Sequence, residues 1–85
     1  MLEKILEYYG DDVEILKADG FDDAIIGVVD DYNEKPRLVY SISKCLKILE
    51  AEGMSDIDAL EYFEFNVEGA YVGEQTPIWC QDEFY

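Results

Sequence analysis

The hydrophobic pattern of this 85-residue chain predicts three helices. The first lies in LEKILEYYG, residues 2–10, where apolar residues recur at helical spacing and a glycine ends the pattern. The second begins after Ser41, a residue type that caps helices, and ends at Gly53. The third begins after Ser55, with aspartates in its first turn. Only Met54 separates Gly53 from Ser55, so we expect a tight corner between the last two helices.

Each predicted helix has one apolar face that we expect to meet the core. In the first helix this face comprises Leu2, Ile5, Leu6 and Tyr9. In the second it comprises Ile42, Cys45, Leu46 and Leu49. In the third it comprises Ala59, Leu60, Phe63 and Val67. The third helix differs from the others because apolar residues continue nearly all round it, interrupted by acids.

Two apolar runs predict a β-hairpin. AIIGVV, residues 24–29, is apolar on both of its alternating faces, which is typical of a central strand. RLVYS, residues 37–41, is its expected partner, because the connector between them is rich in turn-forming residues. Near the C-terminus, residues 70–72 are predicted as a short edge strand and residues 76–79 as extended chain. We therefore expect one α+β domain, with a small β-hairpin or three-stranded antiparallel sheet packed by two or three helices.

The charge distribution indicates what kind of partner the protein binds. The chain has 21 acidic and 6 basic residues and a net charge of −15, but at 49% apolar residues it is too hydrophobic to remain disordered. Residues 1–34 carry a net charge of −9, residues 35–49 carry +4, and residues 50–85 contain ten acids and no base. Such a molecule repels nucleic acid and anionic membranes and attracts cationic partners.

The side chains needed for most enzymatic chemistry are absent. There is no histidine, the usual general base near neutral pH, and we expect Cys45 and Cys80 to be reduced, unreactive thiols. The acidic clusters lack the ligand spacing of a calcium loop, and no phosphate-binding glycine loop occurs. We therefore predict a non-enzymatic protein with no cofactor and no metal. Neither a membrane-spanning run nor a signal peptide is recognisable, which favours a soluble, cytoplasmic protein.

The chain has more aromatic residues than a small core needs, with seven tyrosines, four phenylalanines and one tryptophan. We expect Phe63 and Trp79 to cover the sheet. Tyrosine and tryptophan are residue types that often anchor interfaces, and several aromatic residues fall in the base-free C-terminal region. Core and surface positions both stay open for four of them: Tyr62, Phe65, Phe84 and Tyr85.

Between residues 22 and 79 the chain reads, in order, DDAIIGVV, RLVYS, KCLKILEAEGMS and DALEYFEFNVEGAYVGEQTPIW. In this order the segments resemble small acidic proteins encoded by tailed phages and by bacteria that carry them. The last segment is the most specific part. The resemblance implies a phage-type origin and brings no activity, substrate or catalytic residue with it.

The first functional hypothesis is an inhibitor that imitates nucleic acid. It would bind the basic surface of a host nucleic-acid-binding or defence protein. Carboxylates three or four positions apart on a helix lie roughly 5–6 Å apart, comparable with phosphates along one strand. Aromatic residues beside them would add short-range affinity. The predicted partner-binding residues are Asp30, Asp31, Asp58, Glu61, Tyr62, Glu64, Phe65 and Glu68.

The second hypothesis is a non-enzymatic interaction module or a homodimeric accessory protein. In it, the aromatic C-terminal surface of residues 59–79 docks on a partner and the acids only keep the protein soluble. Mimicry predicts binding that weakens steeply with salt, because exposed charges are screened within about 8 Å at physiological ionic strength. The second hypothesis predicts that Tyr62→Ala or Phe65→Ala matters more than any change of charge.

Overall fold

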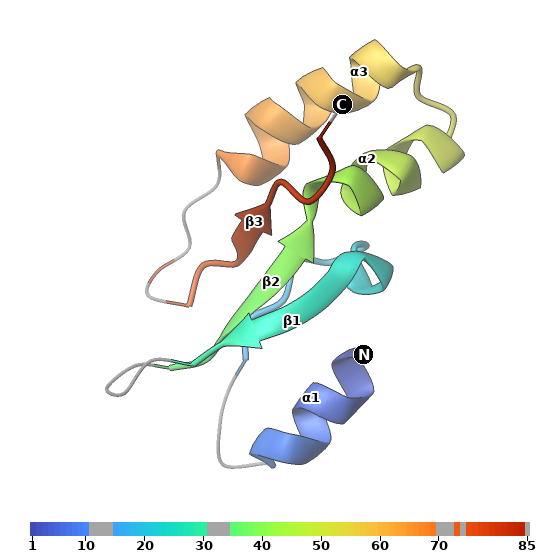
Figure 1. Ribbon diagram of the computed structural model, residues 1–85. Coiled ribbons are helices and arrows are strands. Elements are labelled where there is room, and N and C mark those ends of the chain that lie inside the picture. The colour runs from blue at the N-terminus through green and yellow to red at the C-terminus, as the bar shows by residue number, and fades with distance from the viewer. Residues whose placement is uncertain (11–14, 31–34, 70–72, 74, 85) are drawn as a thin grey trace.

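The computed structural model of this protein describes residues 1–10, 15–30, 35–69, 73 and 75–84. Their elements, in chain order, are α1 (Leu2–Tyr9), the 3₁₀-helix η1 (Asp22–Ala24), β1 (Ile25–Val29), β2 (Arg37–Ser41), α2 (Ile42–Ala51), α3 (Asp56–Tyr62), the π-helix η2 (Phe63–Glu68) and β3 (Ile78–Cys80). The described residues form a three-stranded sheet packed with three α-helices, so the predicted α+β fold is confirmed (Figure 1).

The sheet has the strand order β1-β2-β3 and is mixed. The predicted hairpin is confirmed, since β1 and β2 are antiparallel, with Val28 opposite Leu38. The third strand, β3, runs parallel to β2, with Tyr40 opposite Trp79, so the sheet is not wholly antiparallel. Parallel neighbours need a long crossover connection, and here the chain makes it through α2, α3 and η2.

The central strand is β2, and the prediction that AIIGVV occupies the centre is wrong. Leu38 and Tyr40 of β2 are fully buried, whereas β1 lies at an edge and Val29 at its end is exposed. The β1 strand can be apolar along its whole length although it lies at the sheet edge, because helix α1 contacts it. The predicted edge strand at residues 70–72 lies outside the described residues.

Serine caps begin both helices that follow β2, as predicted. The Ser41 hydroxyl accepts a hydrogen bond from the Lys44 backbone N–H at 3.1 Å, and the Ser55 hydroxyl accepts one from the Asp58 N–H at 3.1 Å. Gly53 turns the chain between the helices with φ 108°, a left-handed conformation that glycine adopts without strain. The tight corner between α2 and α3 is therefore confirmed.

The predicted inward faces were wrong at two leucines. Leu6 of α1 and Leu60 of α3 are 46% and 44% exposed. In α3, Ala59 and Phe63 are four positions apart and both face inward, whereas Leu60 follows Ala59 directly, lies about 100° round the helix from it and is exposed.

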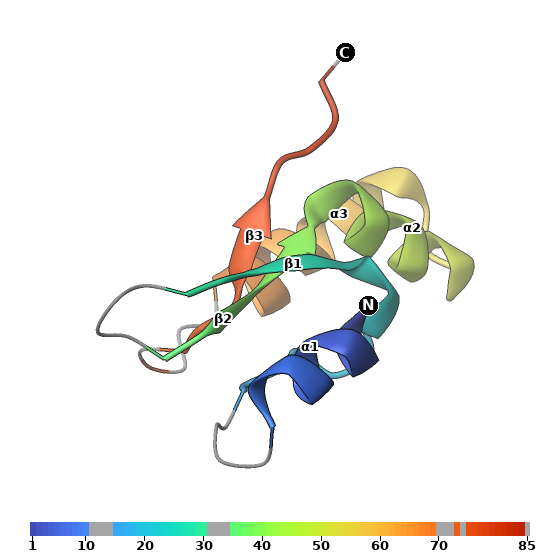
Figure 2. The same ribbon diagram turned by 60° about the horizontal axis from the view of Figure 1, so that its bottom comes forward.

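Three aromatic rings join the sheet to the α3–η2 segment. The Trp79 ring centroid lies 5.0 Å from that of Tyr40 and 5.3 Å from that of Phe63, with the Phe63 contact edge-on at 88°. The Tyr40 hydroxyl also accepts a hydrogen bond from the Ala18 backbone N–H at 2.7 Å, so the loop before η1 is tied to β2. Figure 2 shows α1 apart from α2 and α3, and the chain after β3 rising away from the sheet.

Candidate functional site

The candidate site lies on the solvent side of α3 and η2, which follow each other without a break. The opposite side of this segment is buried, with Ala59 fully enclosed and Phe63 only 1% exposed. Because Phe63 packs on Trp79, and Trp79 pairs with the central strand, the sheet fixes the direction in which the solvent side points. The buried rings therefore present the outer residues as one defined surface.

The outer side of the segment carries exposed carboxylates from four of the predicted residues. They are Asp58, Glu61, Glu64 and Glu68. No ion pair to any of them occurs within the part of the chain that the structure describes, and residues 50–85 contain no lysine or arginine. Like charges three or four positions apart on a helix repel one another, so the segment holds these acids at a cost in stability.

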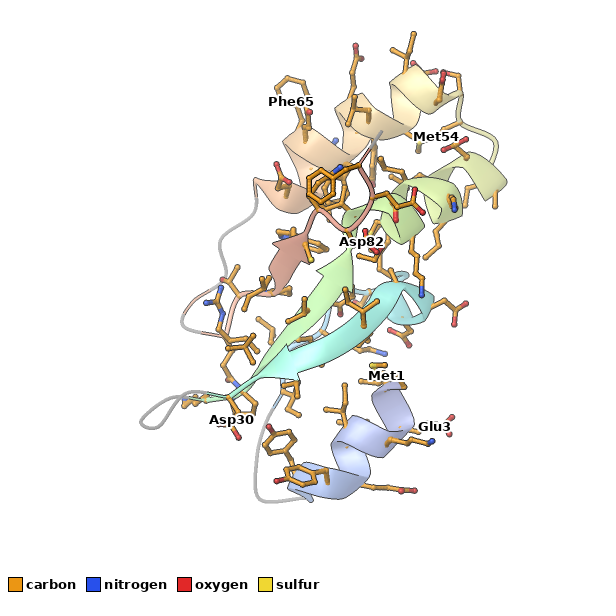
Figure 3. The ribbon with its side chains drawn as sticks, viewed as in Figure 1. Met1, Glu3, Asp30, Met54, Phe65 and Asp82 are labelled. Carbon is orange, nitrogen blue, oxygen red and sulfur yellow. The ribbon has the colours of Figure 1, made fainter. Side chains whose placement is uncertain are left out.

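Large apolar side chains share this surface with the acids. Ile57 is 66% exposed, Leu60 44% and Phe65 81%. Figure 3 shows the Phe65 ring pointing away from the body of the molecule. We use the term outer face for Ile57, Asp58, Leu60, Glu61, Glu64, Phe65 and Glu68 together. Its members recur at the spacing of one side of a helix, so they form a single strip along α3 and η2.

Tyr62 lies at the flank of the outer face and lines a separate cavity. This cavity, of about 330 Å³, lies between η2, the start of β3 and the loop before η1. Its lining residues are Leu16, Lys17, Ala18, Asp19, Phe21, Tyr62, Asn66, Val67, Pro77 and Trp79. The pattern of the sequence did not predict the cavity, because the loop that forms one wall has no periodicity.

Two of the polar side chains that line the cavity are not available to a ligand. The Lys17 ammonium, which lies on its wall, is 3.3 Å from the Asp22 carboxylate and so is already paired. The Trp79 indole nitrogen is buried without a hydrogen-bond partner among the groups of the described chain. Because its surface is closed to water, the nitrogen does not present its N–H to the open space of the cavity.

Asp30 is not brought together with the outer face. It follows β1 and accepts a hydrogen bond from the Tyr9 hydroxyl at 2.9 Å. Figure 3 shows Asp30 beside α1, at the end of the molecule away from Phe65. Asp31 lies outside the described residues. A role for Asp30 in binding therefore stays a prediction, and it would belong to a second surface.

The C-terminal tail makes a carboxylate contact that the sequence did not reveal. The Ser41 and Ser43 hydroxyls donate to the two carboxylate oxygens of Asp82 at 2.7 and 3.0 Å. The hydrogen bond from Ser41 is the main reason that the pKa of Asp82 lies below its ordinary value. The same serine that caps α2 thus also anchors the tail.

Of the two thiols predicted to be inert, Cys45 is buried and has this character. Both cysteines are free. Burial, with a smaller contribution from the nearby Asp82 charge, raises the pKa of Cys45 to about 12, so this thiol stays protonated and non-nucleophilic. In the described ranges no group of three acidic or cysteine side chains is placed to hold a metal ion.

Comparison with known proteins found no matching family model, no similar curated protein and no similar solved structure. Among the described residues no helix has the length and hydrophobicity required to cross a bilayer.

Proposed function

We propose that this protein is a non-catalytic inhibitor that binds the basic surface of a nucleic-acid-binding or defence protein in place of nucleic acid. The observation that carries the proposal is the strip of unpaired carboxylates on the outer face, in a region without a single base. A phage-type origin, which the resemblance of residues 22–79 implies, stays a prediction and agrees with the proposal. Such a partner places the protein's action in the host cytoplasm.

The physics of nucleic-acid binding supports this use of the outer face. Proteins that bind DNA hold it chiefly through lysines and arginines that neutralise phosphates. A row of carboxylates along one side of a helix offers these cations similar contacts, and the net charge of −15 attracts a basic surface over a longer range. Because the segment is packed on the sheet through Phe63, its backbone is ordered before the partner arrives, which lowers the entropic cost of binding.

The test is displacement of bound proteins from DNA. DNA-binding proteins of a bacterial extract are retained on immobilised DNA, and the purified protein is then added at increasing salt. We expect the protein to release a subset of them at low salt and to lose this effect as salt screens the charges. The double variant Glu61→Lys/Glu64→Lys should lose the effect while it keeps the native fold.

The matched control places the same charge change elsewhere. Glu3 and Glu7 are exposed on α1, and Glu3→Lys/Glu7→Lys alters the net charge by the same amount as the outer-face variant. This control should still release the DNA-binding proteins. If both double variants release them as well as the parent does, or if neither does, the outer face is not the binding surface.

The interaction-module hypothesis stays a second candidate because Phe65 is 81% exposed. It predicts binding that is nearly independent of salt and that Phe65→Ala abolishes. Titration of the parent protein and of this variant against a released DNA-binding protein, at low and high salt, distinguishes the two candidates.

A further inference from the structure

The outer face is not a purely anionic surface, and this limits what covers it. Ile57, Leu60 and Phe65 lie between its carboxylates, and their exposed fractions range from 44 to 81%. A partner that offered only charge would leave these side chains in water. Burial of a large apolar side chain contributes to binding in addition to charge pairing, so the best partner has apolar groups between its cations.

Charge decides among the possible occupants. A second copy of this chain that docked with the same face would bring Glu61, Glu64 and Glu68 against other carboxylates, with no base in residues 50–85 of either copy to offset them. Nucleic acid and anionic membranes are repelled for the same reason. A basic surface with interspersed apolar groups satisfies both kinds of residue on the outer face.

The shape of the outer face favours a helical partner. The face runs along a helical segment of 7 α-helical and 6 π-helical residues, a length of about 20 Å at the usual helical rise. It is a convex ridge of side chains, and a second helix packs against such a ridge by laying its own side chains into the grooves. A partner helix of three to four turns would cover it.

We propose that the element recognised by the outer face is a basic amphipathic helix of the partner. Its apolar side chains, at helical spacing, contact Ile57, Leu60 and Phe65, and the lysines or arginines that flank them reach the carboxylates of Asp58, Glu61, Glu64 and Glu68. This inference rests on the proposed function, because it specifies the part of a basic partner that is bound.

The test uses defined peptides in place of an unidentified partner. The probe is a labelled Leu/Lys peptide of about four turns with its leucines on one helical face. A second peptide has the same composition in scrambled order, so that no face is apolar. Binding of each to the full-length protein is measured by fluorescence anisotropy at low and physiological salt.

We expect the amphipathic peptide to bind at least about tenfold more tightly than the scrambled one. Phe65→Ser and Ile57→Ser should each remove most of this preference. Phe84→Ser is the matched control, because Phe84 is 84% exposed in the tail and lies outside the outer face. The control should bind like the parent, and circular dichroism should show that all three variants retain the fold.

The outcomes separate this inference from the proposed function. Equal binding of the two peptides, together with release of DNA-binding proteins that depends on Glu61 and Glu64, would overturn the amphipathic helix and leave the proposed function standing. A preference for the amphipathic peptide that Phe65→Ser leaves unchanged, or that Phe84→Ser removes, would place the binding elsewhere. Self-association of the parent protein that Phe65→Ser abolishes would mean that a second copy covers the face.

Discussion

The two sides of the α3–η2 segment place the same residue type in opposite environments. Phe63 is 1% exposed and packs edge-on against Trp79, whereas Phe65, two positions further along, is 81% exposed. Burial of such a side chain contributes about 1.5–3 kcal/mol. The inner side therefore stabilises the fold, while the outer side leaves that contribution available for a partner.

The two sides of the α3–η2 segment also differ in charge. The inner side of the segment is apolar, and the outer side alternates carboxylates with Ile57, Leu60 and Phe65. An acidic coat that served only solubility would not need large apolar side chains in water. The combination is typical of a binding surface, where apolar contacts supply affinity and charge supplies attraction and selectivity.

The largest predicted difference in stability is between truncation of Phe63 and truncation of Phe65. Phe63→Ala should lower the free energy of unfolding by about 3–5 kcal/mol, because it leaves a cavity beside Trp79. Phe65→Ala should change the free energy of unfolding by less than about 0.5 kcal/mol, because the Phe65 ring is already mostly exposed to water. Urea unfolding of both variants measures the difference. A comparable loss in both would mean that the outer face belongs to the core.

Two tyrosine hydroxyls provide the next sharpest contrast between buried and exposed groups. Tyr40→Phe should cost about 1–3 kcal/mol, because the Ala18 N–H, at 2.7 Å from the hydroxyl, loses its acceptor. Tyr9→Phe removes an exposed hydrogen bond to Asp30 and should cost much less. Thermal unfolding of the two variants under the same conditions tests this order. Equal losses would show that Tyr40 does not tie the loop to β2.

A smaller effect is expected from the serines that cap the two helices. Ser41→Ala should cost about 1–2 kcal/mol and Ser55→Ala about 1 kcal/mol or less, because Ser41 is buried and also donates to Asp82. Urea unfolding of both variants measures the difference. Larger destabilisation by Ser55→Ala would contradict a role for Ser41 in holding the tail.

The contact between Ser41 and Asp82 should also depend on pH. Because the pKa of Asp82 is lower in the folded state, its carboxylate stabilises the fold above the unfolded pKa of about 3.9, and this contribution fades as pH falls through the folded pKa. Unfolding of the parent and of Asp82→Asn, compared at neutral and acidic pH, should show a difference in stability that shrinks in acid. A difference that is constant with pH would exclude the charged contact.

The sequence predicted the local structure well because its signals are local. The apolar spacing and the serine caps placed α1, α2 and α3, and Gly53 placed the corner between the last two helices. The prediction failed for the strand order, which depends on pairing between residues far apart in the chain. Nothing in AIIGVV or RLVYS tells which strand receives β3 as a neighbour, so the centre of the sheet was assigned to the wrong strand.

The sequence predicted which acids form the candidate site, but it predicted only part of their arrangement in space. Glu61, Glu64 and Glu68 follow from helical spacing, which η2 preserves on one side of the segment. The exposure of Leu60 was not predicted, because helical spacing places it at the margin of the face that Ala59 and Phe63 share. The distance of Asp30 from α3 depends on the position of β1 at the sheet edge.

The smallest predicted effect is a gain in stability on the outer face. Glu64 has Glu61 and Glu68 as helical neighbours, so Glu64→Gln should raise the free energy of unfolding by about 0.2–0.5 kcal/mol through relief of repulsion. High salt should reduce the gain, because it screens the same repulsion in the parent. Urea unfolding at two salt concentrations measures both.

The control for this variant is Asp22→Asn. The Asp22 carboxylate lies 3.3 Å from the Lys17 ammonium, so neutralising Asp22 removes an attraction and should produce no gain. If Glu64→Gln instead lowers stability, or if its gain does not respond to salt, the carboxylates of the outer face do not repel one another. If the gain occurs and the same variant binds the amphipathic peptide more weakly, the acids reduce stability where they promote binding, as expected of residues that serve a partner better than the fold.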